Sequence, residues 1–419
     1  VGAGRATPIA NLSRRVMLVN CLYAPFSFGG ATLVVENLVK ELCKAGYEVA
    51  VFTINHLGYS EWRVLKYREH GALVYSVVKK STAKEDEAGD IRLSQIFSEA
   101  IKEFQPGVVH FHAIQQMGCR LLSVAKAHGA KVAVTAHDDW WFCKRQFRMN
   151  GAGVFCGFQQ VDLRECGKCT GDLKGTLTRF REMQGSLALV DMIMTPSKYQ
   201  QELMRSNFPD VQRIEVNKNG IPRPPVGSES AYAARTGPTR FAFIGGIGAH
   251  HKGYNFVKSA FESLDESDYE ILLVDLNQKL GHGQLKRHDW NVKGKVSIVP
   301  PFSGDSIDAF YSSTDVLLAP SQWPESFGLA VREAAARGVY VVASRSGGVT
   351  EDMQGLSNAT LIEPGDFESL KSVLRSLIKD PKRDRNSVRP EFMSIQEQTS
   401  NLISWYDQLV NAVPDLSLK

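Results

Sequence analysis

Short apolar runs alternate with amphipathic helical segments along most of the chain. Residues 16–20 form an apolar run, and residues 33–42 then repeat apolar side chains at helical spacing. Further runs of the same kind occupy residues 49–53, 73–78, 108–112, 132–136 and 191–195. Continuous apolar runs of this length are typical of parallel strands buried on both faces. The pattern therefore predicts an α/β fold built from Rossmann-like, doubly wound βαβ units.

The pattern repeats after a stretch rich in Pro, Gly and Ser at residues 222–238, which we interpret as an interdomain linker. An amphipathic helix at the C-terminus, with Leu402, Tyr406 and Leu409 on one face, closes the chain. The expected segments are 1–13 as disordered or foreign to the natural chain, 14–221 as a first Rossmann-like domain, 239–394 as a second, and 395–414 as the final helix.

The most informative stretch lies in the second domain, at residues 320–338. An apolar strand precedes it, a tight loop and a helix follow, and Gly338 ends the helix. Glu325 lies in the loop and Glu333 inside the helix, eight residues later. The amides of Phe327, Gly328 and Leu329 would be unpaired donors at the helix N-terminus, where a diphosphate can bind. The alternative is an ordinary helix with a solvated acidic face.

Two other strand ends carry candidate ligand-binding residues in the first domain. Gly29 and Gly30 follow the first strand and open a helix, which suits a phosphate or sugar, although turn geometry alone also explains them. His137 follows a buried strand directly, with Asp138 and Asp139 beside it as candidates to orient it or to contact an acceptor. His110 and His112 lie two apart, so they point to one side of their strand, a geometry that could also bind a metal. Since no third ligand is evident nearby, we interpret them as a structural pair.

Four of the seven cysteines fall within one Gly-rich, polar insert at residues 140–172, namely Cys143, Cys156, Cys166 and Cys169. The last two form Cys-x2-Cys, and the group has the spacing of a tetrahedral zinc site. Free thiols and disulfides remain alternatives. Arg145 and two other basic residues of the insert follow His137 closely, so we place Arg145 on the acceptor side, with a solvated charged loop as the alternative.

Glu325 to Glu333, with Ser326-Phe327-Gly328-Leu329 between them, resembles the Glu-x7-Glu signature of retaining GT-B glycosyltransferases of family 4. This resemblance implies two Rossmann-like domains facing each other across a cleft, with the C-terminal helix returning to the first domain. Some bacterial polysaccharide-assembly members carry a similar cysteine insert. In the family, the first Glu contacts the donor sugar, the following amides contact the diphosphate and the second Glu contacts the ribose.

The resemblance also assigns residues outside that motif. It places His137 beside the donor sugar, Lys252 on the donor diphosphate, and the Gly29–Gly30 loop at the donor pocket. His137, Lys252 and Glu325 are thus the expected catalytic residues. The family pattern has an arginine six residues before the lysine, whereas this chain has Gly246 there. His250, His251, Arg240 and Arg345 are candidates to replace that cation.

The function implied is transfer of a sugar from a nucleoside diphosphate sugar to a saccharide or lipid-linked hydroxyl acceptor, with retention of configuration and with no cofactor. No two aspartates lie two apart in the chain, so the Asp-x-Asp site of metal-dependent transferases is missing. Alternatives are a sugar-nucleotide-binding pseudoenzyme, suggested by Gly246, and a GT-B epimerase or sugar-phosphate synthase. A dehydrogenase is disfavoured because neither domain matches the dinucleotide fingerprint.

Composition limits the partners and the location. The chain of 419 residues is 43% hydrophobic and 22% charged, as in globular proteins, and its formal charge of +4 is too small to indicate nucleic-acid binding. The charge is compatible with anionic ligands or an anionic membrane surface. No apolar segment reaches the length of a membrane span, and residues 1–13 lack a signal-peptide core. We therefore expect a cytoplasmic protein, with peripheral association at the inner face of the membrane.

Overall fold

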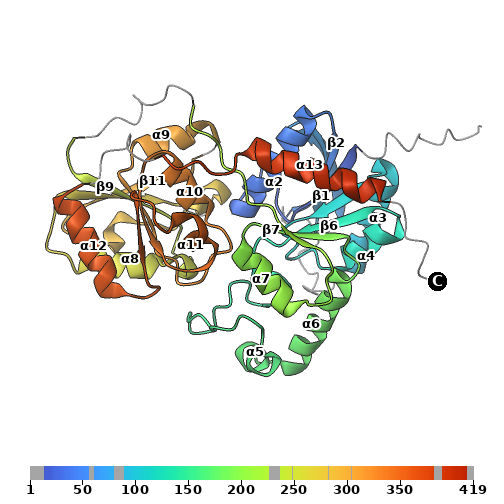
Figure 1. The fold of residues 1–419 in the computed structure, drawn as a ribbon, viewed down its shortest axis with the longest axis horizontal. Coiled ribbons are helices and arrows are strands. Elements are labelled where there is room, and N and C mark those ends of the chain that lie inside the picture. Colours follow the sequence, from blue (N-terminus) through green and yellow to red (C-terminus); the bar gives the residue numbers. More distant parts are fainter. Residues whose placement is uncertain are drawn as a thin grey trace, which may run out of the picture. The chain divides into compact units, whose positions relative to one another are not determined.

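The computed structural model describes residues 14–55, 61–79, 89–225, 236–247, 249–281, 283–302, 304–381 and 389–412. The chain divides into two units (Figure 1). Unit 1 comprises the described parts of residues 1–146, 158–218 and 395–419, and unit 2 those of residues 147–157 and 219–394. The predicted segment 1–13 and residues 226–235 of the predicted linker lie outside the described residues.

Unit 1 is built on a sheet with the strand order β3-β4-β2-β1-β5-β6-β7-β8. All neighbours pair in parallel except the edge strand β3, which is antiparallel to β4. The strands are β1 (Arg15–Val19), β2 (Glu48–Asn55), β3 (Arg63–Glu69), β4 (Ala72–Val78), β5 (Val108–Phe111), β6 (Lys131–Thr135), β7 (Met192–Thr195) and β8 (Ile214–Val216). The chain order reverses direction between β1 and β5, and ligands of such sheets bind beyond the strand ends at this point.

Helices connect the parallel strands of unit 1, as the sequence pattern predicts. They are α2 (Gly30–Lys44), α3 (Ile91–Phe104), α4 (Arg120–Ala127), α5 (Leu163–Thr170), α6 (Leu173–Leu187), α7 (Lys198–Asn207), α13 (Ile395–Asn411) and the 3-10 turn η1 (Asp139–Trp141). Fully buried residues of the central strands, such as Met17, Phe52 and Val134, form the core with the apolar faces of these helices. The N-terminus of α3 is capped by Asp90, whose side chain accepts hydrogen bonds from the amides of Arg92 and Leu93.

The C-terminal helix α13 packs in unit 1 next to α2 (Figure 1), which confirms the predicted return to the first domain. Leu402 and Tyr406 are fully buried there. The Tyr47 hydroxyl lies 3.4 Å from the Asp407 carboxylate, so α13 also contacts the segment between α2 and β2. Within the described residues, every helix is too short or too polar to span a bilayer.

Unit 2 contains a parallel sheet with the order β11-β10-β9-β12-β13-β14. Its strands are β9 (Thr239–Ile244), β10 (Tyr269–Val274), β11 (Lys295–Val299), β12 (Val316–Ala319), β13 (Tyr340–Ser344) and β14 (Ala359–Ile362). The chain runs from β9 outward to β11 and then returns to the other side of β9 with β12. The loops after β9 and β12 therefore emerge side by side at the carboxyl edge of the sheet.

Helices of unit 2 cover both faces of this sheet, with two apolar clusters beneath them. They are α8 (Tyr254–Glu262), α9 (Ile307–Ser312), α10 (Leu329–Ala336), α11 (Gly347–Met353), α12 (Phe367–Lys379) and the 3-10 turns η3 (His250–Lys252), η4 (Leu276–Leu280), η5 (Arg287–Asp289) and η6 (Gly304–Ser306). Alternating strand residues divide between the clusters: Phe241 and Phe243 pack against α8, whereas Ala242 lies in the other cluster.

One part of the predicted first domain groups with unit 2 instead. Residues 147–157 of the cysteine-containing insert make their contacts in unit 2, because the Phe147 ring stacks on His251 with centroids 4.2 Å apart. Phe147 also meets Trp323 edge-on at 4.8 Å. Within the segment, Met149 and Phe155 form an antiparallel bridge. The sequence pattern does not predict this assignment, because an aromatic contact between residues about 100 positions apart leaves no periodic signal.

Candidate active site

The loops after β9 and β12 form the charged centre of unit 2. Lys252 ends the turn η3 after β9, and Glu325 lies in the loop between β12 and α10. The Lys252 Nζ atom lies 2.8 Å from Glu325 Oε2, and the side chains are 35% and 10% exposed. The amide of Gln322 donates to the His251 carbonyl at 2.8 Å and joins the two loops. The structure thus brings together two of the three predicted catalytic residues.

The surroundings of Glu325 keep its carboxylate charged. Burial raises its pKa, but the Lys252 ammonium and the hydrogen bond donated by the Ser321 hydroxyl outweigh burial, and the pKa lies below its usual value. Burial and the neighbouring Lys252 charge lower the pKa of His251 to about 4. The pair at pH 7 is therefore a charged Lys–Glu pair beside a neutral histidine.

Two glycines allow the backbone to close around this ion pair. Gly253 has a φ of 84°, and a Cβ atom there would lie 2.4 Å from the carbonyl oxygen of Pro320. Gly347 has a φ of 61°, and its Cβ would lie 2.3 Å from the Glu325 carbonyl oxygen. The next amide, of Gly348, donates to that same carbonyl at 2.8 Å. A side chain at either glycine would push the Glu325 loop out of position.

Helix α10 begins at Leu329, after Gly328 in the left-handed conformation with a φ of 81°. No side chain caps this helix, so the amides of its first turn are available to a ligand. The predicted donor-binding residues Phe327, Gly328 and Leu329 are consecutive at this helix start. An anion placed here would be favoured by the helix dipole and by Lys252.

The second acidic residue of the motif, Glu333, has a different environment. Its Oε2 atom lies 3.2 Å from the Tyr311 hydroxyl, which is fully buried. Burial raises the pKa of Glu333, and the nearby Arg337 guanidinium and Tyr311 hydroxyl offset this only in part. Arg337 itself pairs with Asp308 at 2.7 Å. Among the described residues, Glu333 therefore has no lysine partner of the kind that Glu325 has.

Sequence reasoning missed the residue that holds the motif together, Arg332. Its fully buried guanidinium donates to the Phe327 and Gly348 carbonyls and to the Asp352 carboxylate, with the last two bonds at 2.8 and 2.5 Å. The guanidinium also lies 3.7 Å from the centroid of the Phe327 ring. The feature of the sequence that could have indicated this role is an arginine on the apolar face of a predicted helix, near Val331 and the alanines 334–336.

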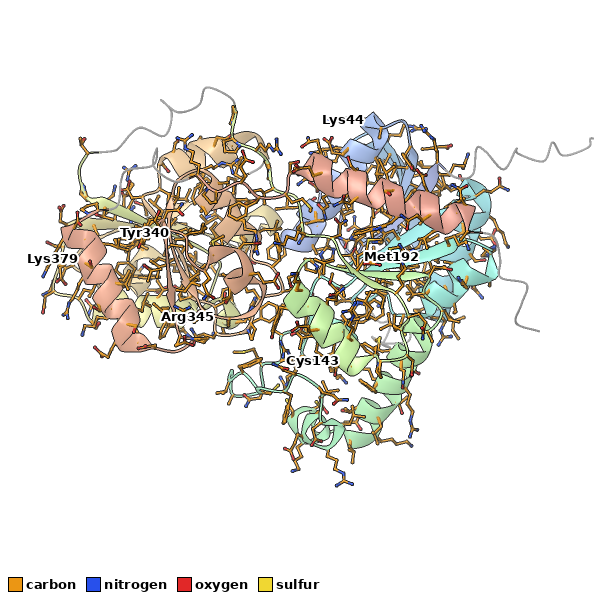
Figure 2. All side chains as sticks on the ribbon, viewed as in Figure 1. Lys44, Cys143, Met192, Tyr340, Arg345 and Lys379 are labelled. Atoms are coloured by element: carbon orange, nitrogen blue, oxygen red, sulfur yellow. The ribbon has the colours of Figure 1, made fainter. Side chains whose placement is uncertain are left out.

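The candidates for the missing cation divide into two groups. Arg240 pairs with Glu270 at 2.8 Å and Arg345, just after β13, pairs with Glu363 at 3.1 Å (Figure 2), so both are neutralised by other carboxylates. His250 and His251 lie next to Lys252 in η3, but the lowered pKa of His251 leaves it neutral at pH 7, so it does not replace the cation. A Cβ atom built on Gly246 would lie 3.3 Å from the Asn277 amide nitrogen, so a larger residue there requires only a small movement of Asn277.

In unit 1, the predicted Gly29 and Gly30 begin α2 beyond the end of β1. Gly29 has a φ of 85°, and a Cβ atom there would meet no atom within 4 Å. Glycine is favoured at position 29 because its φ lies in the left-handed region, and the lack of a side chain leaves open space before α2. The buried Asn20 side chain supports this edge, because its Oδ1 accepts a hydrogen bond from the Ala113 amide at 3.0 Å. The predicted donor contact of the two glycines stays a prediction.

His137 lies against His112 of the His110–His112 pair, a contact that the sequence did not predict. Its Nε2 atom is 2.9 Å from His112 Nδ1, and the two rings stack with centroids 5.2 Å apart. His110 and His112 are buried and their centroids lie 4.1 Å apart. Burial lowers the pKa of His110 to about 3, that of His137 to about 4 and that of His112 well below its usual value. All three rings are therefore neutral at pH 7.

Asp138 and Asp139 differ although they are adjacent. Burial raises the pKa of Asp138 to about 6, against hydrogen bonds from the Gln146 side chain, the Trp140 amide and the Gln115 side chain. Asp139 is fully buried in η1, and its carbonyl accepts a hydrogen bond from the Phe142 amide. Asp138 is thus the better placed of the two to meet a ligand.

The insert gives no support to a metal site in its present geometry. The structure shows no disulfide among the described residues, and these residues contain no cluster of three or more His, Cys, Asp or Glu side chains that could hold a metal ion. Cys143, next to the predicted Arg145, lies in unit 1 (Figure 2), as do Cys166 and Cys169 on α5, whereas Cys156 belongs to unit 2. The Arg145 guanidinium donates to the Cys169 carbonyl at 3.0 Å and so holds the insert together. The zinc site stays a prediction.

Comparison with known proteins gives two family matches that together span most of the chain. Residues 28–223 match the family described as "Glycosyltransferase Family 4", and residues 229–389 match "Glycosyl transferases group 1". The first match lies over unit 1 and ends shortly after β8. The second includes Lys252, Glu325 and Glu333.

Individual relatives agree with these matches. An "uncharacterized 42.6 kDa protein in cps region" of Klebsiella pneumoniae is 23% identical over 85% of this chain and 92% of its own length. Glycogen synthase of Mycobacterium tuberculosis is 23% identical over 90% of this chain and 88% of its own length. The catalytic domain of starch synthase IV from Arabidopsis thaliana, solved with ADP and acarbose, superposes with a TM-score of 0.63 at 15% identity, covering 95% of this chain and 99% of that one.

Proposed function

Because the chain belongs to the group 1, family 4 glycosyltransferases and has the GT-B fold, we propose that it transfers a sugar from a nucleoside diphosphate sugar to a hydroxyl acceptor with retention of configuration. The observation that carries this proposal is the Lys252–Glu325 ion pair beside the uncapped start of α10. Cation, amide donors and carboxylate lie together there, and a sugar diphosphate offers the matching groups.

The proposed donor contacts follow from the charges in unit 2. The diphosphate accepts hydrogen bonds from the first amides of α10 and interacts with Lys252, which then shares its charge between phosphate and Glu325. Glu325, charged and held by Ser321, accepts hydrogen bonds from sugar hydroxyls. Glu333, which has no lysine partner of its own, accepts from the ribose hydroxyls. Gly328 keeps side-chain atoms away from the phosphate.

The proposed reaction proceeds on one face of the sugar. The bond between the anomeric carbon and the phosphate oxygen breaks, and its electron pair stays on the diphosphate. The acceptor oxygen forms a bond to the anomeric carbon on the same face, and its proton passes to the leaving phosphate oxygen. Lys252 and the α10 amides stabilise the charge that develops on the diphosphate, a role worth about 3 to 4 kcal/mol for a single well-placed donor. No metal ion is needed for this step.

The proposed acceptor and setting follow from the similar proteins and from the net charge. Glycogen synthase and starch synthase, named among the similar proteins, act in the synthesis of polysaccharides, which supports a saccharide acceptor. A lipid-linked acceptor would bring the enzyme to the inner face of the membrane, and the net charge of +4 is compatible with anionic lipids. Asp138 and Arg145 are the proposed acceptor-side residues, and the four insert cysteines remain a proposed structural zinc site.

A sugar-nucleotide-binding pseudoenzyme is the second candidate, and Gly246 favours it. Arg240, Arg345 and Arg332 are each paired with a carboxylate, of Glu270, Glu363 and Asp352, which leaves Lys252 as the cation proposed to meet the diphosphate. Calorimetric titration with UDP-, GDP- and ADP-sugars, followed by product analysis with a saccharide acceptor library, separates the candidates. Transfer to any acceptor supports the transferase. Binding with no turnover supports the pseudoenzyme, and turnover of the donor alone into an epimer supports an epimerase.

A further inference from the structure

Unit 1 contains an array of three histidine rings that begins at the C-terminal helix. The Tyr406 hydroxyl of α13 lies 2.6 Å from His110 Nδ1, and His110 Nε2 lies 2.8 Å from the Thr135 hydroxyl. Both nitrogens of His110 are thus engaged, and its ring packs against that of His112 at an angle of 37° with centroids 4.1 Å apart. Tyr406 and His110 are both fully buried.

His112 is the link between this fixed ring and His137. Its Nδ1 faces His137 Nε2 at 2.9 Å, and its Nε2 is buried with no hydrogen-bond partner in the described part of the chain. A neutral histidine carries its proton on one nitrogen only. If that proton were on Nε2, the structure would bury an N–H group without an acceptor, which proteins avoid more strictly than an unused lone pair.

The proton of His112 therefore belongs on Nδ1, from which it is donated to His137. His137 Nε2 must then accept and cannot carry a proton itself while the ring is neutral. The remaining proton of His137 is on Nδ1. The reverse arrangement would require His137 to donate from Nε2 and would leave the buried His112 N–H unpaired.

We infer that His112 fixes His137 as the tautomer protonated on Nδ1, and that Tyr406 and His110 are positioning residues that hold the His112 ring through the ring contact of His110 with His112. In the transfer reaction proposed above, on which this functional reading rests, His137 then acts as a neutral hydrogen-bond donor to an oxygen of the nucleotide sugar. It does not act as a general base. Through Tyr406, helix α13 also contributes to the positioning of His137. Tyr406 and His110 are 296 positions apart in the chain and meet through tertiary packing.

The tautomer is measured directly on the intact protein labelled with 15N-histidine, by long-range proton–nitrogen correlation at pH 7.5. A His137→Gln variant assigns the signals. We expect His137 to give the pattern of a neutral ring protonated on Nδ1. A neutral ring protonated on Nε2, or a charged ring, overturns the inference. Because this readout needs no substrate, it remains decisive even if the chain proves to have no transferase activity.

Variants of His112 test whether it acts through its Nδ1 proton or only fills space. The amide nitrogen of an Asn side chain can occupy the place of histidine Nδ1 and donate from there, whereas Phe fills the volume without a donor. We expect His112→Phe to give mixed His137 tautomers and a kcat lowered about tenfold with the donor KM nearly unchanged. His112→Asn should restore both the tautomer and most of kcat. Equal losses in the two variants contradict the positioning role.

Two further variants complete the design. His128→Asn removes an exposed histidine that bonds Ser98 on the surface, and it should change neither the His137 signal nor kcat. Tyr406→Phe keeps the packing of α13 but removes the hydrogen bond to His110, so we expect a shifted His110 signal and a loss of about threefold in kcat. Thermal unfolding shows that each variant is folded. An unchanged His110 signal in Tyr406→Phe overturns the part of the inference that concerns α13.

Discussion

The ion-pair cluster of unit 2 and the histidine array of unit 1 both lie at the carboxyl edge of a parallel sheet, but the first is charged and the second is neutral. Lys252 and Glu325 follow β9 and β12, which flank the reversal point of one sheet, and His112 and His137 follow the neighbouring strands β5 and β6 of the other. The first pair is charged at pH 7, whereas the histidines are neutral because burial lowers their pKa values. The carboxyl edge of such a sheet can thus supply either charge or fixed hydrogen-bond donors.

This difference indicates that the ion-pair cluster and the histidine array have separate roles in the proposed reaction. The leaving group is a diphosphate, and charge there is best met by a lysine and helix amides. A sugar is uncharged, and neutral donors and acceptors of fixed orientation recognise it without the cost of desolvating an unpaired charge. The comparison therefore predicts that changes in unit 2 act on diphosphate binding, and changes in the histidine array act on turnover.

The largest expected effect comes from removing the charge of Lys252. Lys252→Met should lower kcat/KM for the donor about a thousandfold, because the diphosphate loses the cation proposed to meet it and Glu325 loses its counter-ion. The matched control is Lys258→Met on α8, which breaks a surface pair with Glu262 and should leave kcat/KM unchanged. A loss of less than fivefold at Lys252 removes it from the catalytic residues.

A smaller effect is expected at the second acid of the motif. Glu333→Gln should weaken binding of the free nucleoside diphosphate about thirtyfold, because a carboxylate accepts ribose hydrogen bonds more strongly than an amide does. The Tyr311 hydroxyl can still donate to the amide oxygen, so unit 2 should remain stable. Calorimetry measures the change, and Glu368→Gln at the start of α12 serves as the control. Unchanged affinity in Glu333→Gln would exclude the ribose contact.

Mild acid should destabilise unit 1 through its histidines. The pKa of His110 is lowered in the folded state, so its contribution to stability is present above pH 6.5 and is lost as the pH falls toward about 3. Between pH 7 and pH 5.5 the protonation of His110 in the unfolded state lowers the free energy of unfolding by about 1.3 kcal/mol. His112 and His137, whose pKa values burial also lowers, add to this loss, whereas Asp138, with its raised pKa, opposes it. Urea unfolding at both pH values tests the prediction, and His110→Gln should remove the His110 share of the difference while that of the other two histidines remains.

The smallest effect concerns the missing cation. Gly246→Arg should improve donor affinity about threefold, because Asn277 needs to move only slightly and the new guanidinium can reach toward the α10 start. Gly246→Gln adds similar bulk without charge and is the control. If both variants weaken donor binding equally, there is no room for a cation at position 246, and this chain binds its donor without an arginine there.

Much of the fold and of the unit 2 site could be predicted from the sequence, because both depend on local patterns. Apolar runs mark the buried strands, and Glu325, Gly328 and Glu333 occur within nine consecutive residues, so one strand–loop–helix unit places them. Lys252 is more distant, but it follows a neighbouring strand and the topology of the sheet brings it close.

The contacts that complete both sites could not be predicted in this way. Tyr406 meets His110, Arg332 meets Asp352, and Phe147 meets His251, in each case through side chains that tertiary packing brings together. The sequence shows only that such residues interrupt an apolar face or lie in an insert. The interpretation of His110 and His112 as a structural pair was correct about their burial, and it did not reveal their contact with His137.

The most direct test of these separate roles is calorimetric titration of a free nucleoside diphosphate into Lys252→Met and His137→Ala variants. The ligand is the nucleoside diphosphate that binds the unaltered chain. The account predicts that Lys252→Met loses most of the affinity, whereas His137→Ala binds within about twofold of the unaltered chain and yet turns over poorly. If His137→Ala loses as much diphosphate affinity as Lys252→Met, the charged and neutral clusters do not have separate roles and the account is wrong.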